Sequence, residues 1–235
     1  MRTLVARPRA AGRFPGVLFY SDIFQLTGPM VRAVARLAGY GFVVAAPEIY
    51  HRIERADTAL AFDDAGRDRG LADAARTTVG EFDADCRSAL DHLAAHPAVA
   101  PGKLAAAGFC IGGHLSFRAA LQPDVRATAC FYPTGLHDGA LGKDRDAGSL
   151  ARCREISGDL LLVFGTRDPH TPPDGVAKVE NALVAARRRF KLVRYPGEHT
   201  FMRDEGARYD PELADRAWAD MIALFRGTLG PPAVG

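Results

Sequence analysis

Short apolar runs alternate with amphipathic segments along most of the sequence, and this alternation restricts the possible fold more than any other feature. The runs cover residues 16–20, 42–46, 103–108, 127–131, 159–164 and 190–195. Each run has the length of a buried strand, and amphipathic segments between them can form crossover helices. The pattern predicts an α/β fold, with a mostly parallel central sheet and helices on both faces.

Four helices are predicted from apolar positions that recur with a helical period. Thr27 can cap the first, and Asp210 followed by Pro211 is typical of the start of the last, which we expect Gly227 and Gly230 to end. The expected buried faces consist of Val31, Val34, Ala35 and Ala38; Val79, Phe82, Cys86, Leu90 and Leu93; Val176, Val179, Leu183 and Val184; and Leu213, Ala217, Trp218, Met221, Leu224 and Phe225.

The chain has the length of one compact domain, so we predict a single domain over residues 1–235. Residues 52–78 depart from the alternating pattern. They are polar, rich in Arg and Asp, and carry few large apolar side chains. We interpret this segment as an excursion over the edge of the sheet.

Charge and cysteine content narrow the class of partner. A net charge of +2 and a pI near 8.4 are too mild to favour nucleic acid or a membrane surface, so a small molecule is the expected partner. No apolar stretch reaches the roughly 20 residues of a membrane span, and no signal peptide is evident, which favours the cytoplasm. The four cysteines show no spacing typical of a disulfide framework or a zinc site, so we expect no metal. No cofactor motif appears either.

Residues 108–112 read Gly-Phe-Cys-Ile-Gly, the pattern of a nucleophile elbow with cysteine in the position of the usual serine. The turn from strand to helix is tight, and a side chain at either glycine would collide with neighbouring backbone. The elbow places Cys110 at the carboxyl end of a strand and at the positive end of a helix, which stabilises the reactive thiolate. A buried structural cysteine in a glycine-rich turn remains an alternative for this motif taken alone.

Two further residues, an aspartate and a histidine, follow the cysteine in the order that a catalytic triad has along the chain. Asp168 follows the run at residues 159–164 in a turn closed by Pro169, and His199 follows the last run, before the terminal helix. Taken alone, Asp168 could be an ordinary turn residue. Nucleophile, acid and histidine in this order, each at the end of a strand, are the arrangement of α/β hydrolases. We therefore predict a catalytic triad of Cys110, Asp168 and His199.

The other six histidines are weaker candidates for the general base. His114 lies one helical turn beyond Cys110, but an elbow points the thiol away from its own helix, so a structural role is favoured. We expect His92 and His96 to lie at the surface of a helix. His170 neighbours Asp168 but directly follows Pro169, which disfavours it, and His51 and His137 lie in loops with no paired base or acid.

An oxyanion hole in this fold uses the backbone N–H of the residue after the nucleophile and a second N–H from the loop after an early strand. Ile111 is the first predicted donor, and Ile23 is our candidate for the second. Losing one such donor typically costs about 2.7–4 kcal/mol of transition-state stabilisation.

These residues resemble the dienelactone hydrolases, also called carboxymethylenebutenolidases. The likeness covers about residues 15–225 and is carried by residues 22–24, 46–50, 108–113, 131–132, 165–169 and 199–203, of which the cysteine elbow is the most discriminating. The resemblance implies a hydrolase without a cofactor. Its cysteine attacks a lactone or carboxylic ester and forms an acyl-enzyme that water then hydrolyses.

The resemblance also implies roles for charged residues. Arg203, four residues after the histidine, corresponds to a family arginine that holds a substrate carboxylate, and Arg67 or Arg69 could supply a second. Asp22 stands where the family has a glutamate that poises the thiol. Aspartate is one methylene shorter, so its reach toward Cys110 is reduced. Glu48 also replaces a more usual aspartate, with no consequence that we can derive.

Two other functions compete with this one. A catalytically degenerate hydrolase could use Cys110 for binding or redox sensing, and the Asp22 substitution favours that alternative. A class I glutamine amidotransferase also uses a Gly-x-Cys-x-Gly motif, but it needs a His-x-Glu pair, whereas Thr200 and Phe201 follow His199. The expected partner is a small ester or lactone, and the resemblance implies that it carries a carboxylate. The expected oligomeric state is a monomer or small homo-oligomer.

Overall fold

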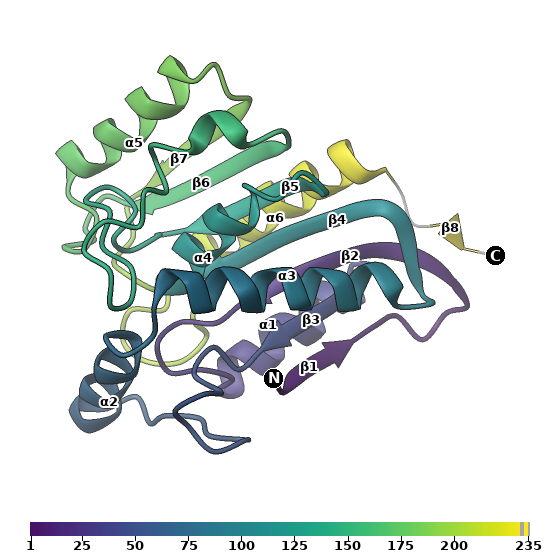
Figure 1. Cartoon of the computed structure of the whole chain (residues 1–235), viewed down its shortest axis with the longest axis horizontal. Coiled ribbons are helices and arrows are strands. Elements are labelled where there is room, and N and C mark those ends of the chain that lie inside the picture. Colours follow the sequence, from purple (N-terminus) through teal and green to yellow (C-terminus); the bar gives the residue numbers. More distant parts are fainter. Residues whose placement is uncertain (231–232, 235) are drawn as a thin grey trace.

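A computed structural model describes residues 1–230 and 233–234 of the chain, and these form one sheet of eight strands between two layers of helices (Figure 1). The strand order is β1-β3-β2-β4-β5-β6-β7, and β8 pairs with β2. The strands are β1 Thr3–Ala6, β2 Gly12–Tyr20, β3 Val43–Pro47, β4 Val99–Phe109, β5 Val125–Phe131, β6 Asp159–Gly165, β7 Phe190–Tyr195 and β8 Ala233–Val234. The neighbours from β3 through β7 are parallel, which confirms the predicted α/β-hydrolase fold.

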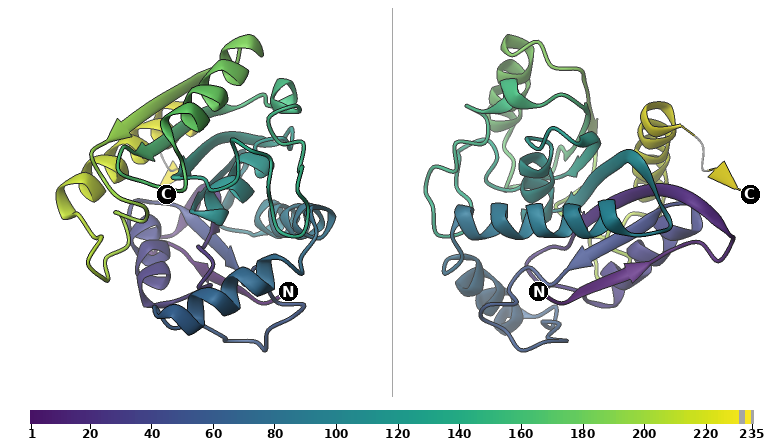
Figure 2. Two further views of the ribbon diagram at one scale, coloured as in Figure 1. Left: turned by 90° about the vertical axis from the view of Figure 1, so that its left-hand side faces the viewer. Right: turned by 45° about the vertical axis from the view of Figure 1, so that its right-hand side comes forward.

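The helices cover both faces of the sheet, and Figure 2 shows the two layers from other directions. On one face lie α1 Gly28–Gly39 and α6 Pro211–Leu229, and on the other lie α3 Val79–Ala95, α4 Ile111–Ala119 and α5 Pro173–Ala185. A single-turn helix, η1, spans Cys153–Glu155. Helices α1, α3, α4 and α5 each connect two parallel strands, because each returns the chain to the edge of the sheet where the next strand begins.

Strand β2 illustrates why the apolar runs become central strands. Val17 and Phe19 face the α1 and α6 layer, whereas Leu18 and Tyr20 face the α3 and α4 layer. Successive side chains of a strand point to opposite faces, so a strand with helices on both sides must be apolar throughout. Burying each such large side chain contributes about 1.5–3 kcal/mol.

The predicted helices are present, with two corrections to their buried faces. In α1, Val31 and Ala35 are exposed, and the buried stripe is Met30, Ala33, Val34, Leu37 and Ala38. This stripe has the same period but includes Met30 and Leu37, which remove more apolar surface from water than Val31 and Ala35 would. In α5, Val184 is likewise exposed.

The last helix begins as expected and ends slightly later. The Asp210 carboxylate accepts a hydrogen bond from the Leu213 N–H at 3.0 Å, so it caps the helix that Pro211 opens. The helix passes through Gly227, where a Cβ atom would meet no other atom within 4 Å, and ends at Gly230, which has φ +74°. Gly230, and not Gly227, is the terminator.

The polar excursion contains a helix, α2 Asp64–Ala74, that the sequence pattern did not indicate. It lies beyond the carboxyl ends of the parallel strands, at the lower left of Figure 1. Asp63 caps it by accepting a hydrogen bond from the Gly66 N–H at 2.7 Å. Residues 52–78 therefore form one wall of a cavity above the sheet.

Candidate active site

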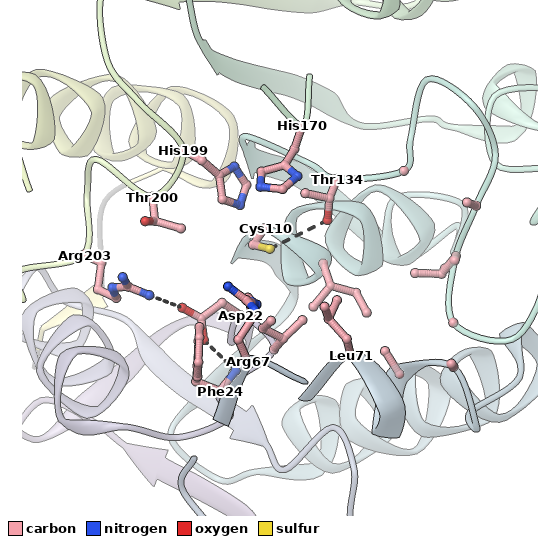
Figure 3. Close-up of a pocket in the computed structure, with 18 of the residues that line it drawn as sticks. Asp22, Phe24, Arg67, Leu71, Cys110, Thr134, His170, His199, Thr200 and Arg203 are labelled. Atoms are coloured by element: carbon pink, nitrogen blue, oxygen red, sulfur yellow. Dashed lines mark hydrogen bonds and ion pairs between the residues drawn. The ribbon is translucent and has the colours of Figure 1, made fainter. Parts of the chain in front are cut away.

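A cavity of about 600 Å³ lies at the carboxyl ends of the parallel strands (Figure 3). Five neighbouring strands, β2, β4, β5, β6 and β7, are each followed by a residue of this site: Asp22, Cys110, Thr134, Asp168 and His199 respectively. Asp168 lies behind His199, and the other four line the cavity. Residues more than 170 positions apart in sequence thus meet because parallel strands end at one edge of the sheet.

Cys110 occupies a strained turn between β4 and α4. Its backbone φ angle of +58° lies in the left-handed region, which residues other than glycine rarely adopt. A Cβ atom at Gly108 would come within 2.3 Å of the Gly112 carbonyl oxygen, and one at Gly112 within 2.3 Å of the Ser21 oxygen. Both glycines are therefore required for the elbow, as the sequence analysis expected.

His199 and Asp168 form a buried pair. His199 Nδ1 lies 2.7 Å from Asp168 Oδ2, and both side chains are almost fully shielded from solvent. The carboxylate can only accept here, so Nδ1 carries the proton and Nε2 is left for chemistry, with the ring beside the Cys110 sulfur in Figure 3. Burial lowers the pKa of His199, but Cys110 and Asp168 outweigh burial and raise it to about 9.

Asp168 is held by its own turn as well as by the imidazole. Its Oδ1 atom accepts a hydrogen bond from the His170 N–H at 2.8 Å. Burial raises the pKa of Asp168, but the hydrogen bond to His199 and the charge of His199 bring it below its usual value. A low pKa keeps this carboxyl ionised, which is the form that orients an imidazole.

The structure also brings His170 to the site, although its position directly after Pro169 disfavoured it in the sequence analysis. Its ring centroid lies 4.6 Å from that of His199, and it lines the cavity. Burial and the nearby His199 lower the pKa of His170. Its position two residues after Asp168 was the only sequence signal that it would lie here.

The two residues predicted to supply the oxyanion donors both line the cavity. Ile23 and Ile111 are among the lining residues, and neither backbone N–H has an acceptor within the described residues. The Phe24 N–H, in contrast, donates to Asp22 Oδ1 at 3.0 Å. Two free backbone donors beside a nucleophile are what a developing oxyanion requires.

Asp22 lies beside Arg203 and makes no hydrogen bond to the thiol. Its Oδ2 atom lies 3.7 Å from Arg203 Nη1, and Figure 3 shows these side chains side by side below Cys110. The Arg203 guanidinium lies over the rings of Phe62 and Phe24, at 4.1 and 5.6 Å from their centroids. Burial raises the pKa of Asp22 to about 6, against the opposing effects of the Phe24 N–H, Arg203 and His199.

The two arginines expected from the excursion lie in different places. Arg67, on α2, lines the cavity, while its guanidinium contacts Asp64 and Asp68. Arg69 donates from Nε and Nη2 to Glu54 at 2.6 and 2.5 Å and is not among the cavity residues. Arg69 is therefore wrong as a candidate for substrate binding, because the helix turns it away from the cavity.

Thr134 was not singled out by the sequence analysis. Its Oγ1 atom lies 3.7 Å from Cys110 Sγ, and its N–H donates to the Cys110 carbonyl oxygen at 3.3 Å. A threonine in a loop carries no sequence signal of such a contact. Only the pairing of β5 beside β4 places it there.

The residues that the structure describes, 1–230 and 233–234, were considered for a metal site and for a membrane span. No three or more His, Cys, Asp or Glu side chains among them are grouped so that they could hold a metal ion. No helix among them has the length and apolar character that crossing a bilayer requires.

Comparison with known proteins was made against families, curated sequences and solved structures. The model of the dienelactone hydrolase family matches residues 1–229. The chain belongs to the dienelactone hydrolase family. This confirms the resemblance on which the sequence analysis relied, and it makes the chain a hydrolase of that family.

Relatives of this dienelactone hydrolase family member match over nearly their whole lengths. A protein of Saccharomyces cerevisiae named "Putative carboxymethylenebutenolidase" is 35% identical, with 97% of this chain and 87% of that protein covered. A protein of the same name from Synechocystis is 30% identical, with 96% and 91% covered. The crystal structure of a "Putative Dienelactone Hydrolase" from Klebsiella pneumoniae superposes with a TM-score of 0.83 at 26% identity, with 95% and 91% covered.

Proposed function

We propose that the protein hydrolyses a small lactone or carboxylic ester through a cysteine acyl-enzyme, with Cys110 as nucleophile, His199 as general base and acid, and Asp168 as the group that orients His199. The observation that carries this proposal is the buried 2.7 Å contact between His199 Nδ1 and Asp168 Oδ2, beside a cysteine in a nucleophile elbow. The family membership supports it independently.

In the acylation step, the Cys110 thiolate attacks the carbonyl carbon of the substrate. The Ile23 and Ile111 N–H groups stabilise the resulting oxyanion. The tetrahedral intermediate collapses, the bond from carbon to the leaving oxygen breaks, and protonated His199 gives that oxygen its proton. For an ester the alcohol departs, and for a lactone the ring opens while the product stays attached through sulfur.

In the deacylation step, His199 takes a proton from a water molecule that attacks the thioester carbonyl. The bond from carbon to sulfur then breaks, which releases the carboxylic acid and restores the thiolate and the imidazolium. Asp168 stabilises the imidazolium that is present at the start and the end of each cycle. A pKa of about 9 keeps His199 protonated at neutral pH in the resting enzyme.

Arg203 is our candidate for holding a carboxylate on the substrate. Its guanidinium borders the cavity, and the rings of Phe24 and Phe62 restrict its movement. Asp22 lies 3.7 Å away, longer than a close ion pair, so the arginine keeps hydrogen-bonding capacity for a ligand.

The test is a panel of lactones, aryl esters and thioesters, with and without a carboxylate, assayed with the wild type, Cys110→Ala and the control Cys153→Ala. Cys153 is buried away from the cavity. We expect Cys110→Ala to lose about 10³-fold or more in kcat/KM, Cys153→Ala to keep activity, and the intact mass of the wild type to show an acyl adduct early in turnover.

Two outcomes would contradict the proposal. Undiminished hydrolysis by Cys110→Ala would exclude this cysteine as the nucleophile. A Cys110 that reacts with thiol reagents, in a protein that turns over none of the panel, would instead support the sensing or binding alternative.

A further inference from the structure

The Cys110 sulfur has a hydrogen-bonding partner outside the proposed triad. Thr134 Oγ1 lies 3.7 Å from Cys110 Sγ, within hydrogen-bonding distance for sulfur, and Figure 3 shows this contact on the other side of the sulfur from Asp22. The Thr134 hydroxyl makes no other hydrogen bond within the described residues. A thiolate can only accept, so in that state the hydroxyl must donate to sulfur.

The backbone of Thr134 is fixed from two sides. Its N–H donates to the Cys110 carbonyl oxygen at 3.3 Å, and its carbonyl oxygen lies 3.1 Å from His114 Nδ1. A carbonyl oxygen only accepts, so His114 carries its proton on Nδ1. His114 is completely buried, and burial lowers its pKa to about 3, so the ring stays neutral and keeps this tautomer.

His114 is in turn held by a buried polar network. With its proton on Nδ1, its Nε2 atom must accept from the Ser149 hydroxyl, which lies 2.7 Å away. Arg118 donates from Nη1 to Ser149 Oγ at 3.0 Å and to the Ala147 carbonyl oxygen at 2.7 Å, while its Nε donates to Asp83 Oδ1 at 2.8 Å. Every donor in this series has one permitted direction, and together these contacts hold Thr134, Ala147 and Ser149 against α4.

We propose that Thr134 is a further catalytic residue, whose hydroxyl donates a hydrogen bond to the Cys110 thiolate, and that His114 is a positioning residue that holds Thr134 in place. The proposal rests on the role of Cys110 as nucleophile. It assigns to Thr134 the contact with sulfur that Asp22 does not make, since Asp22 is engaged with the Phe24 N–H and lies beside Arg203.

The test compares Thr134→Val, which removes the hydroxyl and keeps the shape, with Thr134→Ser, which keeps the hydroxyl. The first measurement is the rate of Cys110 alkylation by iodoacetamide as a function of pH, followed by peptide mass spectrometry. A hydrogen bond to a charged group is worth about tenfold in an equilibrium constant. We therefore expect Thr134→Val to move the midpoint of the profile upward by about one pH unit, and Thr134→Ser to stay near the wild type.

The other groups around the sulfur do not change between these variants. They are His199, His170, Asp22, Arg203, Tyr50 and Tyr132, so their contributions cancel in the comparison. Cys130 is fully buried in β5 and reports on folding, because it becomes alkylated only when the protein opens. If Thr134→Val opens in this way, Thr134→Ala replaces it in the same comparison.

Steady-state kinetics supply the second measurement. We expect kcat to fall by about tenfold in Thr134→Val with KM little changed, because the hydrogen-bonding contact of the hydroxyl is with the Cys110 sulfur. An alkylation profile of Thr134→Val that matches the wild type would overturn the proposal. Alkylation needs no substrate. If the protein shows no esterase activity, the proposed function fails, but the alkylation profiles still test the role of Thr134.

His114 is tested by rescue with a conservative variant. In His114→Asn the amide NH₂ can replace Nδ1 as donor to the Thr134 carbonyl oxygen, whereas His114→Leu has no donor. We expect His114→Leu to shift the Cys110 alkylation profile as Thr134→Val does, and His114→Asn to restore part of that shift. Equal profiles for the two folded variants would exclude a positioning role.

Discussion

His199 Nδ1 and Asp168 Oδ2 lie 2.7 Å apart, and both side chains are almost completely buried. The two residues follow neighbouring strands, β6 and β7, so the register of those strands sets their separation. Because the carboxylate fixes the imidazole tautomer, the pair determines which ring nitrogen faces Cys110.

Asp168→Asn should reduce kcat/KM by about 10³- to 10⁴-fold. The amide nitrogen of asparagine can donate to Nδ1 and so favours the tautomer with its proton on Nε2, which cannot act as a base toward Cys110 or water. Steady-state kinetics on the best ester or lactone measure this loss. The matched control is Asp174→Asn, an exposed residue of α5, which should keep wild-type kinetics, and wild-type activity in Asp168→Asn would exclude the role of Asp168.

Asp22→Asn should change the pH dependence of stability. The pKa of Asp22 is about 6 in the folded protein against 3.8 when unperturbed, so the folded state binds more protons between these values. The protonated Asp22 carboxyl therefore contributes fully to the stability of the wild type below pH 3.8, and this contribution is lost as the pH rises through 6. Asparagine does not titrate, so the unfolding free energy of the variant should gain about 2–4 kcal/mol relative to the wild type between pH 3.5 and 7.

Urea unfolding at several pH values measures this difference. For the control Asp174→Asn, the difference in unfolding free energy from the wild type should be nearly independent of pH between 3.5 and 7. A constant difference for Asp22→Asn would show that the Asp22 carboxyl titrates normally.

Gly70→Ala should lower kcat. A Cβ atom at Gly70 would come within 2.5 Å of the Ile23 carbonyl oxygen, so either α2 or the loop that carries the Ile23 N–H must shift. A displaced oxyanion donor costs transition-state stabilisation, and we expect kcat to fall by about tenfold or more. Gly80→Ala is the control, since that position in α3 has open space around it and alanine favours the helix. Unchanged kcat in folded Gly70→Ala would separate α2 from the oxyanion hole.

Arg118→Met should destabilise the fold by about 2–4 kcal/mol, because it leaves Asp83, Ser149 and the Ala147 carbonyl oxygen without a buried donor. Arg152→Met breaks an exposed pair with Glu155 and should cost at most about 1 kcal/mol. Thermal or urea unfolding distinguishes the two. Equal effects would mean that the network around residues 134–149 contributes little to stability.

The central strands and the three residues at their ends could be predicted from sequence because both depend on local signals. Buried parallel strands appear as apolar runs, and Cys110, Asp168 and His199 each follow such a run. Family membership and fold are confirmed by the comparisons, whereas the roles of the three residues stay predictions.

Other parts of the molecule depend on tertiary contacts that leave no periodic pattern. Strand β1 is short and only partly buried at the edge of the sheet, and it pairs with β3 in the antiparallel direction. Helix α2 has little apolar character and is held by close backbone approaches at Gly66 and Gly70. Thr134 and His170 reach the site through strand pairing and turn geometry, which residue type alone does not encode.

The cavity has two walls, which meet where the Lys143 N–H donates to the Thr77 carbonyl oxygen at 2.8 Å. Helix α2 rests on the loop after β2 through Gly70 and Ile23, and residues 134–149 are anchored by Arg118 on α4. Neither wall supplies the contact between Asp168 and His199. A sequence that replaces residues 52–78 could therefore reshape one side of the substrate chamber only if it kept both the close approach of Gly70 to Ile23 and the hydrogen bond from Lys143 to residue 77.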